Sequence, residues 1–234
     1  MNIQIDKELL TILPHVKIGI NHYTKITVSE SPQMLKGRLQ LFQEQLYFEL
    51  DTKPLTEFAN IQEWRVVWKA LGADPNRYRP SVESLFRRIK KQEFLQSVHT
   101  AVDLNTFFSL QYEIPIGIYD LAKIVGDIQL TQGNEDDSYD GLNGRPNSLN
   151  RLLLLKDDYS PFGSPYVDSV RTAVTAETTE AIQIFFIRPS MDTTEALQLL
   201  QASGKMFTSM SGGEAESFVL HAGQTSIALE NDQA

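Results

Sequence analysis

The sequence predicts a single α/β domain built from a mixed sheet with flanking helices. The 234-residue chain is 41% hydrophobic and 22% charged, as is ordinary for a soluble globular protein. Strand-like and helix-like segments alternate along it, and no internal repeat or low-complexity linker separates them. The chain is long enough to bury a core without a metal or disulfide, and it contains no cysteine. We therefore expect residues 1–234 to form one domain.

The first half of the chain predicts one strand region followed by helices. Residues 15–29 alternate apolar and polar side chains, as a half-buried strand does. Ser31 and Ser81 each precede an apolar helical pattern and can cap it. Gly72 ends a pattern that contains both tryptophans. The predicted helices cover residues 31–49, 61–71, the segment from Ser81 onward, and 101–112.

The second half mixes short strands with polar loops. Residues 114–117 (IPIG) are predicted to end the helix over 101–112, and residues 119–125 to form a short helical or turn segment. A long exposed loop or hairpin is predicted over 133–150. The most strongly predicted central strand is 181–188 (AIQIFFIR), because it is apolar almost throughout. Further strands are predicted at 127–130, 151–156 and 217–221, and a helix at 193–205.

Charge is unevenly distributed along the chain. The net charge of −9 argues against a protein that coats itself with nucleic acid. Residues 61–92, however, carry a net charge of +5, whereas residues 120–180 carry −6. The basic segment has two interpretations: the solvated last turn of a helix, where cations complement the helix dipole, or a strip that contacts phosphates. The second interpretation predicts four nucleic-acid contacts, namely Arg79, Arg87, Arg88 and Lys91.

Common catalytic and cofactor motifs are absent from the sequence. It contains no G-x-S-x-G elbow, P-loop or G-x-G-x-x-G turn, and its four histidines lack metal-ligand spacing. We therefore predict no metal and no cofactor. The N-terminus has no basic region of the signal-peptide kind, and no run of about 18 apolar residues occurs. We expect a cytoplasmic protein that does not span a membrane.

Three motifs in order resemble a known family. They are R-x-x-P-S-x-E-x-L-x-R-R, beginning at Arg77, then V-D-x-N from Val102, then P-x-G-x-x-D from Pro115. Together with the segment that begins at Asp168, they are similar to the B3/B4 domain of the phenylalanyl-tRNA synthetase beta chain, and more closely to its free-standing relatives. The resemblance is strongest over residues 64–188 and implies the same mixed α/β fold.

The resemblance implies a trans-acting editing hydrolase with tRNA as its partner. In the synthetase, this domain hydrolyses the ester of a tRNA that carries the wrong amino acid. Such a second sieve is needed because one binding pocket cannot reject a similar side chain accurately enough. An aminoacyl ester is activated, so a positioned water and orienting polar groups suffice. The chain lacks the synthetase's other regions, so we do not expect it to charge tRNA.

Site residues follow from the same resemblance. Asn105 and Thr106 fall on a pocket Thr-Asn pair in reversed order, and are predicted to be catalytic. Pro115 and Gly117 are predicted to border the substrate, with Gly117 standing where the synthetase has histidine, as in the free-standing relatives. Asp168 is the expected acidic counterpart that binds the substrate amine. We expect Asn105, Thr106, Gly117 and Asp168 to line one cleft.

Ordinary structural roles also fit these residues. Pro115 and Gly117 can simply turn the chain, Asn105 can hydrogen-bond to backbone, and Asp120 can cap a helix. Two further functions are compatible with the sequence. One is a non-catalytic RNA- or tRNA-binding module that uses the same surface. The other is a small-molecule binding protein for an amino acid, which the acidic net charge favours.

Overall fold

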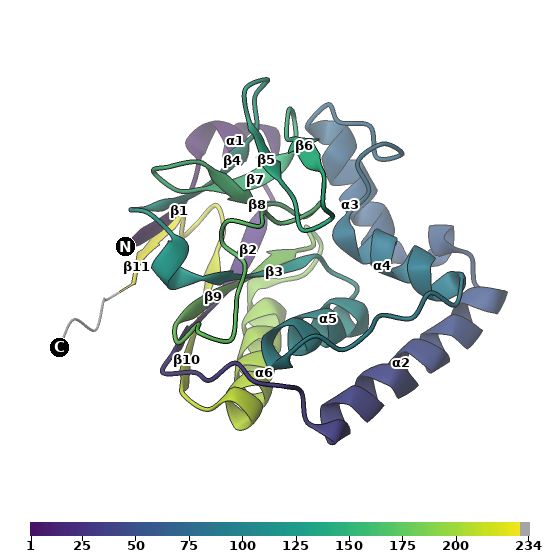
Figure 1. The fold of residues 1–234 in the computed structure, drawn as a ribbon. Helices are drawn as coiled ribbons and strands as arrows, with labels where there is room; N and C mark the ends of the chain where they lie inside the picture. The colour runs from purple at the N-terminus through teal and green to yellow at the C-terminus, as the bar shows by residue number, and fades with distance from the viewer. Residues whose placement is uncertain (230–234) are drawn as a thin grey trace.

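The structure is a computed structural model that describes residues 1–229, which form two main sheets, one hairpin and six α-helices (Figure 1). The helices are α1 (Lys7–Ile12), α2 (Gln33–Thr52), α3 (Ala59–Ala70), α4 (Ser81–Lys90), α5 (Thr100–Tyr112) and α6 (Thr193–Ser211), with 3-10 turns η1 (Leu55–Glu57) and η2 (Leu121–Lys123). The strands are β1 (Asn2–Ile5), β2 (Lys17–Thr24), β3 (Ile116–Asp120), β4 (Ile128–Gln132), β5 (Ser138–Asp140), β6 (Pro146–Ser148), β7 (Leu153–Lys156), β8 (Pro161–Gly163), β9 (Ala181–Ile187), β10 (Glu214–Leu220) and β11 (Ser226–Ala228).

The central layer is an antiparallel sheet in the order β10-β2-β9-β3. Helices α5 and α6 cover one of its faces. Successive residues of a strand point to opposite faces. On β9, Phe185 therefore faces the helices, while Ile184 and Phe186 join the apolar cluster on the other side. Both faces are buried, which explains why β9 is almost entirely apolar.

A second sheet lies on that other side, in the order β11-β1-β4-β7-β8. Strands β1 and β4 are parallel, and the remaining pairs are antiparallel. The predicted α/β fold with a mixed sheet and flanking helices is therefore confirmed. Strands β5 and β6 form a separate hairpin within the region predicted as a loop or hairpin.

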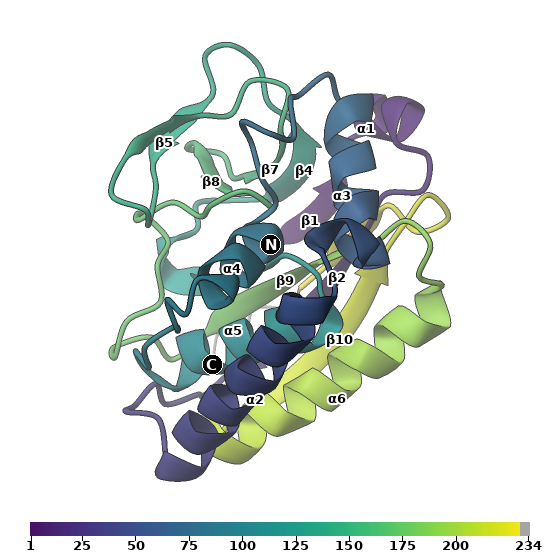
Figure 2. The same ribbon diagram turned by 90° about the vertical axis from the view of Figure 1, so that its right-hand side faces the viewer.

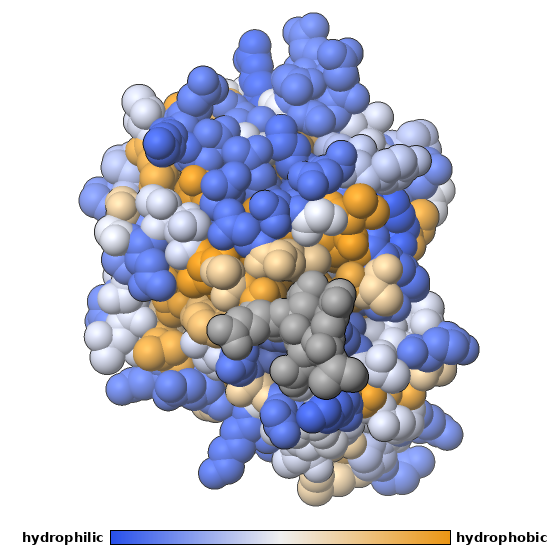
Figure 3. Space-filling view, turned by 90° about the vertical axis from the view of Figure 1, so that its left-hand side faces the viewer, coloured by the Kyte–Doolittle hydropathy of each residue, from blue (hydrophilic) through white to orange (hydrophobic). Residues whose placement is uncertain are grey.

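Helix α2 lies at the periphery of the molecule, at the lower right of Figure 1 and in the foreground of Figure 2. It packs against α4 and α5, and its buried residues are Leu35, Leu39, Gln43, Leu46 and Leu50. The face of the molecule in Figure 3 is hydrophilic over its upper part, with apolar side chains gathered across its middle. None of the described helices combines the length and apolar character needed to cross a lipid bilayer.

Two predicted helix caps differ from the structure. The residues at the cap positions of α2 and α4 are Pro32 and Pro80, rather than Ser31 and Ser81. Ser81 is instead the first residue of α4, and its N–H donates to the Pro165 carbonyl at 2.7 Å. The start of α4 is therefore fixed by a loop that lies far away in the sequence.

The segment around residues 114–125 also differs from the prediction. Residues 116–120 form strand β3 rather than a break followed by a helical turn, because pairing with β9 outweighs the local turn signals. The cap considered for Asp120 is present, since its carboxylate accepts from the Ala122 N–H at the start of the short turn η2.

Candidate functional site

Tyr119 occupies the space beside two glycines. A Cβ atom added to Gly117 on β3, or to Gly163 on β8, would overlap the hydroxyl oxygen of Tyr119. The phenol packs edge-on against Phe162, with ring centroids 4.9 Å apart. Its hydroxyl donates to Oδ1 of Asp168 at 2.7 Å. The glycine at position 117 is therefore required by this packing: the place that a larger side chain would take is filled by Tyr119.

Asp168 is half-buried, with its carboxyl group against Tyr119. Burial raises the pKa of Asp168 to about 7, although hydrogen bonds from the Tyr119 hydroxyl and from the Ser164 N–H (3.4 Å) act in the opposite direction. Burial and the nearby Asp168 carboxyl raise the pKa of Tyr119 and of Tyr139 well above the usual value. A carboxyl group that titrates near neutral pH can act as a general base in the cell.

Asn105 belongs to helix α5 and packs against the other face of β3. Its Nδ2 donates to the Ile116 carbonyl at 2.9 Å, and its Oδ1 accepts from Gln183 at 3.0 Å. Gln183 in turn accepts from Tyr23, which stacks on Phe207 of α6. This places the Asn105 carboxamide on the helix-covered face of the central sheet. The backbone hydrogen bond considered for Asn105 is present.

The structure therefore does not assemble the expected single cleft. Gly117 and Asp168 come together through Tyr119 on the face toward the second sheet. Asn105 is on the opposite face, and Thr106 follows it on α5 as a half-buried residue. These faces were not predicted, because residues 116–120 were not expected to form a strand.

Pro115 stands immediately before β3 and is buried. Its carbonyl accepts from the Phe186 N–H at 3.0 Å, so it extends the pairing between β3 and β9. A proline fits at this point because it can precede a strand without leaving a ladder hydrogen bond unmade. This hydrogen bond makes Pro115 part of the central sheet.

The basic segment forms one hollow along α4. The hollow measures ≈ 630 Å³ and is lined by Leu55, Thr56, Arg79, Arg87, Lys90 and Lys91. Three of the four predicted nucleic-acid residues thus share one surface, and Lys90 joins them. Arg88 is exposed on the same helix but does not line this hollow. Four cations around one concavity provide the charge and the room to bind phosphate groups.

Arg87 also has a structural role. It pairs with the buried carboxylate of Glu83 at 2.8 Å, and Arg65 pairs with the same carboxylate at 3.0 Å. Two arginines on one carboxylate leave a net positive charge beside the hollow. Removing a partner from a buried carboxylate is strongly destabilising, so Arg87 is a poor position for testing nucleic-acid binding alone.

The hollow and Asp168 belong to neighbouring segments. The Ser81 N–H at the start of α4 donates to the Pro165 carbonyl at 2.7 Å. Tyr78 packs edge-on against Tyr166, with ring centroids 5.5 Å apart. These contacts join the segment that carries Arg79 to the loop that carries Asp168. Local sequence patterns contain no signal for this contact, because the two segments are far apart along the chain.

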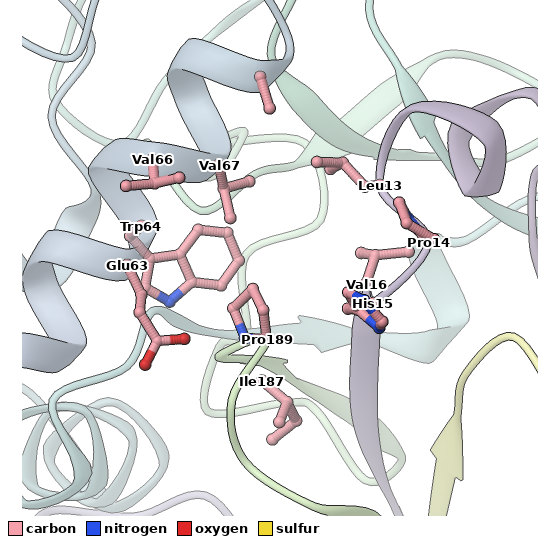
Figure 4. Close-up of a pocket in the computed structure, with 11 residues that line it drawn as sticks. Leu13, Pro14, His15, Val16, Glu63, Trp64, Val66, Val67, Ile187 and Pro189 are labelled. Carbon is pink, nitrogen blue, oxygen red and sulfur yellow. The ribbon is translucent and has the colours of Figure 1, made fainter.

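A separate hollow of ≈ 290 Å³ has almost entirely apolar walls (Figure 4). Trp64 and Val67 of α3 face Leu13 and Val16 across it. None of the predicted site residues lines it.

The rim of this apolar hollow carries one carboxylate. Glu63 accepts hydrogen bonds there from the Ser190 N–H, at 3.0 Å, and from the Ser190 hydroxyl. Because that carboxylate is already engaged, the hollow does not provide the charge complement that the amino group of a free amino acid requires.

A family model and two curated relatives match this chain. A family model described as the B3/4 domain matches residues 63–204. The chain is 31% identical over 214 residues to the protein YhzB of Bacillus subtilis, which covers 91% of this chain and 96% of that protein. It is 22% identical over 151 residues to the phenylalanine–tRNA ligase beta subunit of Paramagnetospirillum magneticum, which covers 54% of this chain and 19% of that protein.

Among solved structures, an N-terminal fragment of the phenylalanyl-tRNA synthetase beta-subunit from Pyrococcus horikoshii matches with a TM-score of 0.44 and 13% identity, over 91% of this chain and 49% of that one. The family resemblance predicted from the three motifs is confirmed by the family model, which matches more than half of the chain. The chain belongs to the B3/4 domain family.

Proposed function

We propose that this chain hydrolyses the ester bond of mischarged aminoacyl-tRNA in trans. The observation that carries the proposal is Asp168, a carboxyl group with a pKa near 7 that is oriented by Tyr119 on a domain of this family. At neutral pH about half of such groups are ionised and can accept a proton from an attacking water. The role predicted from the sequence, pairing with the amino group of the substrate, is an alternative to this one, because a cation beside Asp168 would lower its pKa and make it a weaker base.

The basic hollow supports the tRNA part of the proposal. Arg79, Lys90 and Lys91 would contact the sugar–phosphate backbone, and the Tyr78–Tyr166 contact ties this surface to the loop of Asp168. Phosphate contacts of this kind position the RNA without reading its sequence.

Asn105 acts in this arrangement as a positioning residue. It holds the Ile116 carbonyl of β3 from the helix-covered face, and so fixes the strand that carries Gly117 and Tyr119. Its effect on hydrolysis would therefore pass through the position of Tyr119, which in turn orients Asp168.

A deacylation assay tests this proposal. Purified protein is offered a panel of correctly charged and mischarged tRNAs, and we expect release of the amino acid from at least one mischarged species. Asp168→Asn should lower kcat/KM by at least about tenfold, since the amide cannot act as a base. Asn105→Ala tests its positioning role and should lower kcat less than Asp168→Asn does, and Thr106→Ala tests the catalytic role predicted for that residue. Absence of release across the whole panel would overturn hydrolysis.

The second candidate function is tRNA binding without hydrolysis. It is favoured by the separation of Asn105 from Asp168 on opposite faces of β3. The basic hollow would bind tRNA without any contribution from Asp168. Release assays and binding assays therefore distinguish the two candidates: binding without release supports the second, and release supports the first.

Binding through the hollow predicts a specific mutational pattern. Lys91→Glu should weaken tRNA binding and reduce the magnitude of the slope of log K against log salt by about one, the share of one phosphate contact. Arg88→Glu is the matched control, because Arg88 lies on the same helix outside the hollow. Filter binding at several salt concentrations measures both effects. Equal losses for the two variants would assign these cations to a general electrostatic effect rather than to the hollow.

A further inference from the structure

Helix α2 has a second apolar stripe that nothing in the described part of the chain covers. Met34, Leu41 and Phe48 are 68%, 56% and 70% exposed. They are spaced seven residues apart, so they lie within a narrow band of the helix surface. The buried leucines of the same helix, such as Leu39 and Leu46, lie on the opposite side. Three large apolar side chains in line on an exposed helix face are typical of a helix that packs against another helix.

The charges along α2 identify the kind of partner. Residues 33–42 contain Lys36 and Arg38 and no acid, whereas residues 43–52 contain Glu44, Glu49 and Asp51 and no base. Within the chain, Lys36 pairs with Glu30 and Glu49 pairs with Lys53. Arg38 then remains in the first half, and Glu44 and Asp51 remain in the second, so the two halves carry +1 and −2. A second α2 in antiparallel orientation would set each basic half against an acidic half. A parallel copy would set like charges together.

Gly37 is consistent with a close helix partner. It lies in the interior of α2 on the exposed side, and a Cβ added there would meet no atom within 4 Å. Glycine inside a helix is less favourable than alanine, and no crowding among the described residues explains its presence here. A small residue beside the stripe allows a second backbone to come near.

We propose that two copies of this chain associate through α2, packed antiparallel about Leu41. This arrangement covers the whole stripe on both copies: Leu41 meets its own counterpart, and Met34 of one copy lies near Phe48 of the other. The interface is isologous, as in most two-fold dimers. The proposal is independent of the proposed hydrolysis, because it involves no residue of the Asp168 region or of the basic hollow.

The oligomeric state and its response to mutation test the proposal. Light scattering across a wide range of concentration should show a monomer–dimer equilibrium. Leu41→Glu should weaken dimerisation at least about tenfold, because it buries a charge at the centre of the interface. Leu142→Glu is the matched control, since Leu142 is a similarly exposed leucine (59%) beyond β5 in the hairpin. A monomer at every concentration, or equal effects of both variants, would overturn the proposal.

Cysteine cross-linking tests the orientation, because the chain has no cysteine of its own. In the antiparallel dimer, Leu41→Cys should form a disulfide-linked dimer under mild oxidation. Met34→Cys and Phe48→Cys should not, since each would lie about 14 residues, or roughly 21 Å, from its counterpart along the helix. Cross-linking of all three single variants would show a parallel dimer and contradict the arrangement.

Discussion

Gly117→Ala is expected to lower the free energy of unfolding by ~3 kcal/mol, at the upper end of the usual cost of overpacking. The added methyl group would overlap the hydroxyl and Cζ atoms of Tyr119. Tyr119 cannot easily move aside, because its hydroxyl is held by Asp168 at 2.7 Å and Gly163 stands against it from β8. Chemical denaturation at pH 7 measures the change.

A double-mutant cycle identifies the cause of this loss. Tyr119→Leu alone should also destabilise the chain, because it removes a hydrogen bond and leaves a cavity. In the combined variant the new methyl group occupies part of the vacated space. The combined cost should therefore be lower than the sum of the two single costs by at least about 1.5 kcal/mol. Additive costs would mean that the two side chains do not compete for the same space.

Tyr119 also limits access to the proposed site. The space beside Gly117 is open to a ligand only if Tyr119 moves, since its phenol occupies that space. A ligand that enters beside Asp168 would therefore have to accept the Tyr119 hydroxyl as a neighbour or displace it. Near-zero destabilisation by Gly117→Ala would show that Tyr119 rearranges readily, and would indicate a site that opens on binding.

Much of the fold follows from local patterns in the sequence. The largely apolar segment 181–188 predicts a central strand, and β9 is that strand, ending one residue earlier at Ile187. Asp120 caps the turn after β3, as its position indicates. Strand β3 itself was not predictable, because Pro115 and Gly117 are turn residues by local chemistry and join the sheet only through pairing with β9. The short strand β1 likewise depends on partners far along the chain.

The site was predictable only in part. The sequence places a basic cluster at the end of one helix, and three of the four residues predicted to contact nucleic acid line the hollow. Sequence patterns could not separate Arg88 from Lys90, because the distinction rests on the orientation of α4 toward η1. Tyr119 was missed altogether. The available signal was a large aromatic residue two positions after Gly117, since such residues lie on the same face of a strand.

The pH dependence of stability should depend strongly on Asp168. Folding raises the pKa of this carboxyl from 3.8 to about 7. Between these values the folded chain retains a proton that the unfolded chain has released. The free energy of unfolding therefore falls as the pH rises through this window, and this contribution becomes constant above it. This pKa shift corresponds to a decrease of about 4 kcal/mol in the free energy of unfolding.

Asp168→Asn should remove this contribution. The amide oxygen can still accept the hydrogen bonds from Tyr119 and from the Ser164 N–H, but it carries no charge that burial would oppose. At pH 8 the variant should be more stable than the wild type, by roughly 8–15 °C in Tm. Near pH 4 the two proteins should differ little. Asp136→Asn is a suitable control, because Asp136 is an exposed carboxylate just before β5.

Stability and activity should then move in opposite directions with pH. If the ionised Asp168 is the base, deacylation rises through the same range near pH 7 in which the wild type loses stability, because one ionisation controls both. Unfolding measured from pH 4 to 8, together with the pH profile of kcat/KM, tests this coupling. If wild type and Asp168→Asn showed the same stability profile, Asp168 would be ionised at neutral pH like an ordinary surface carboxylate, and it would not be a base poised near pH 7.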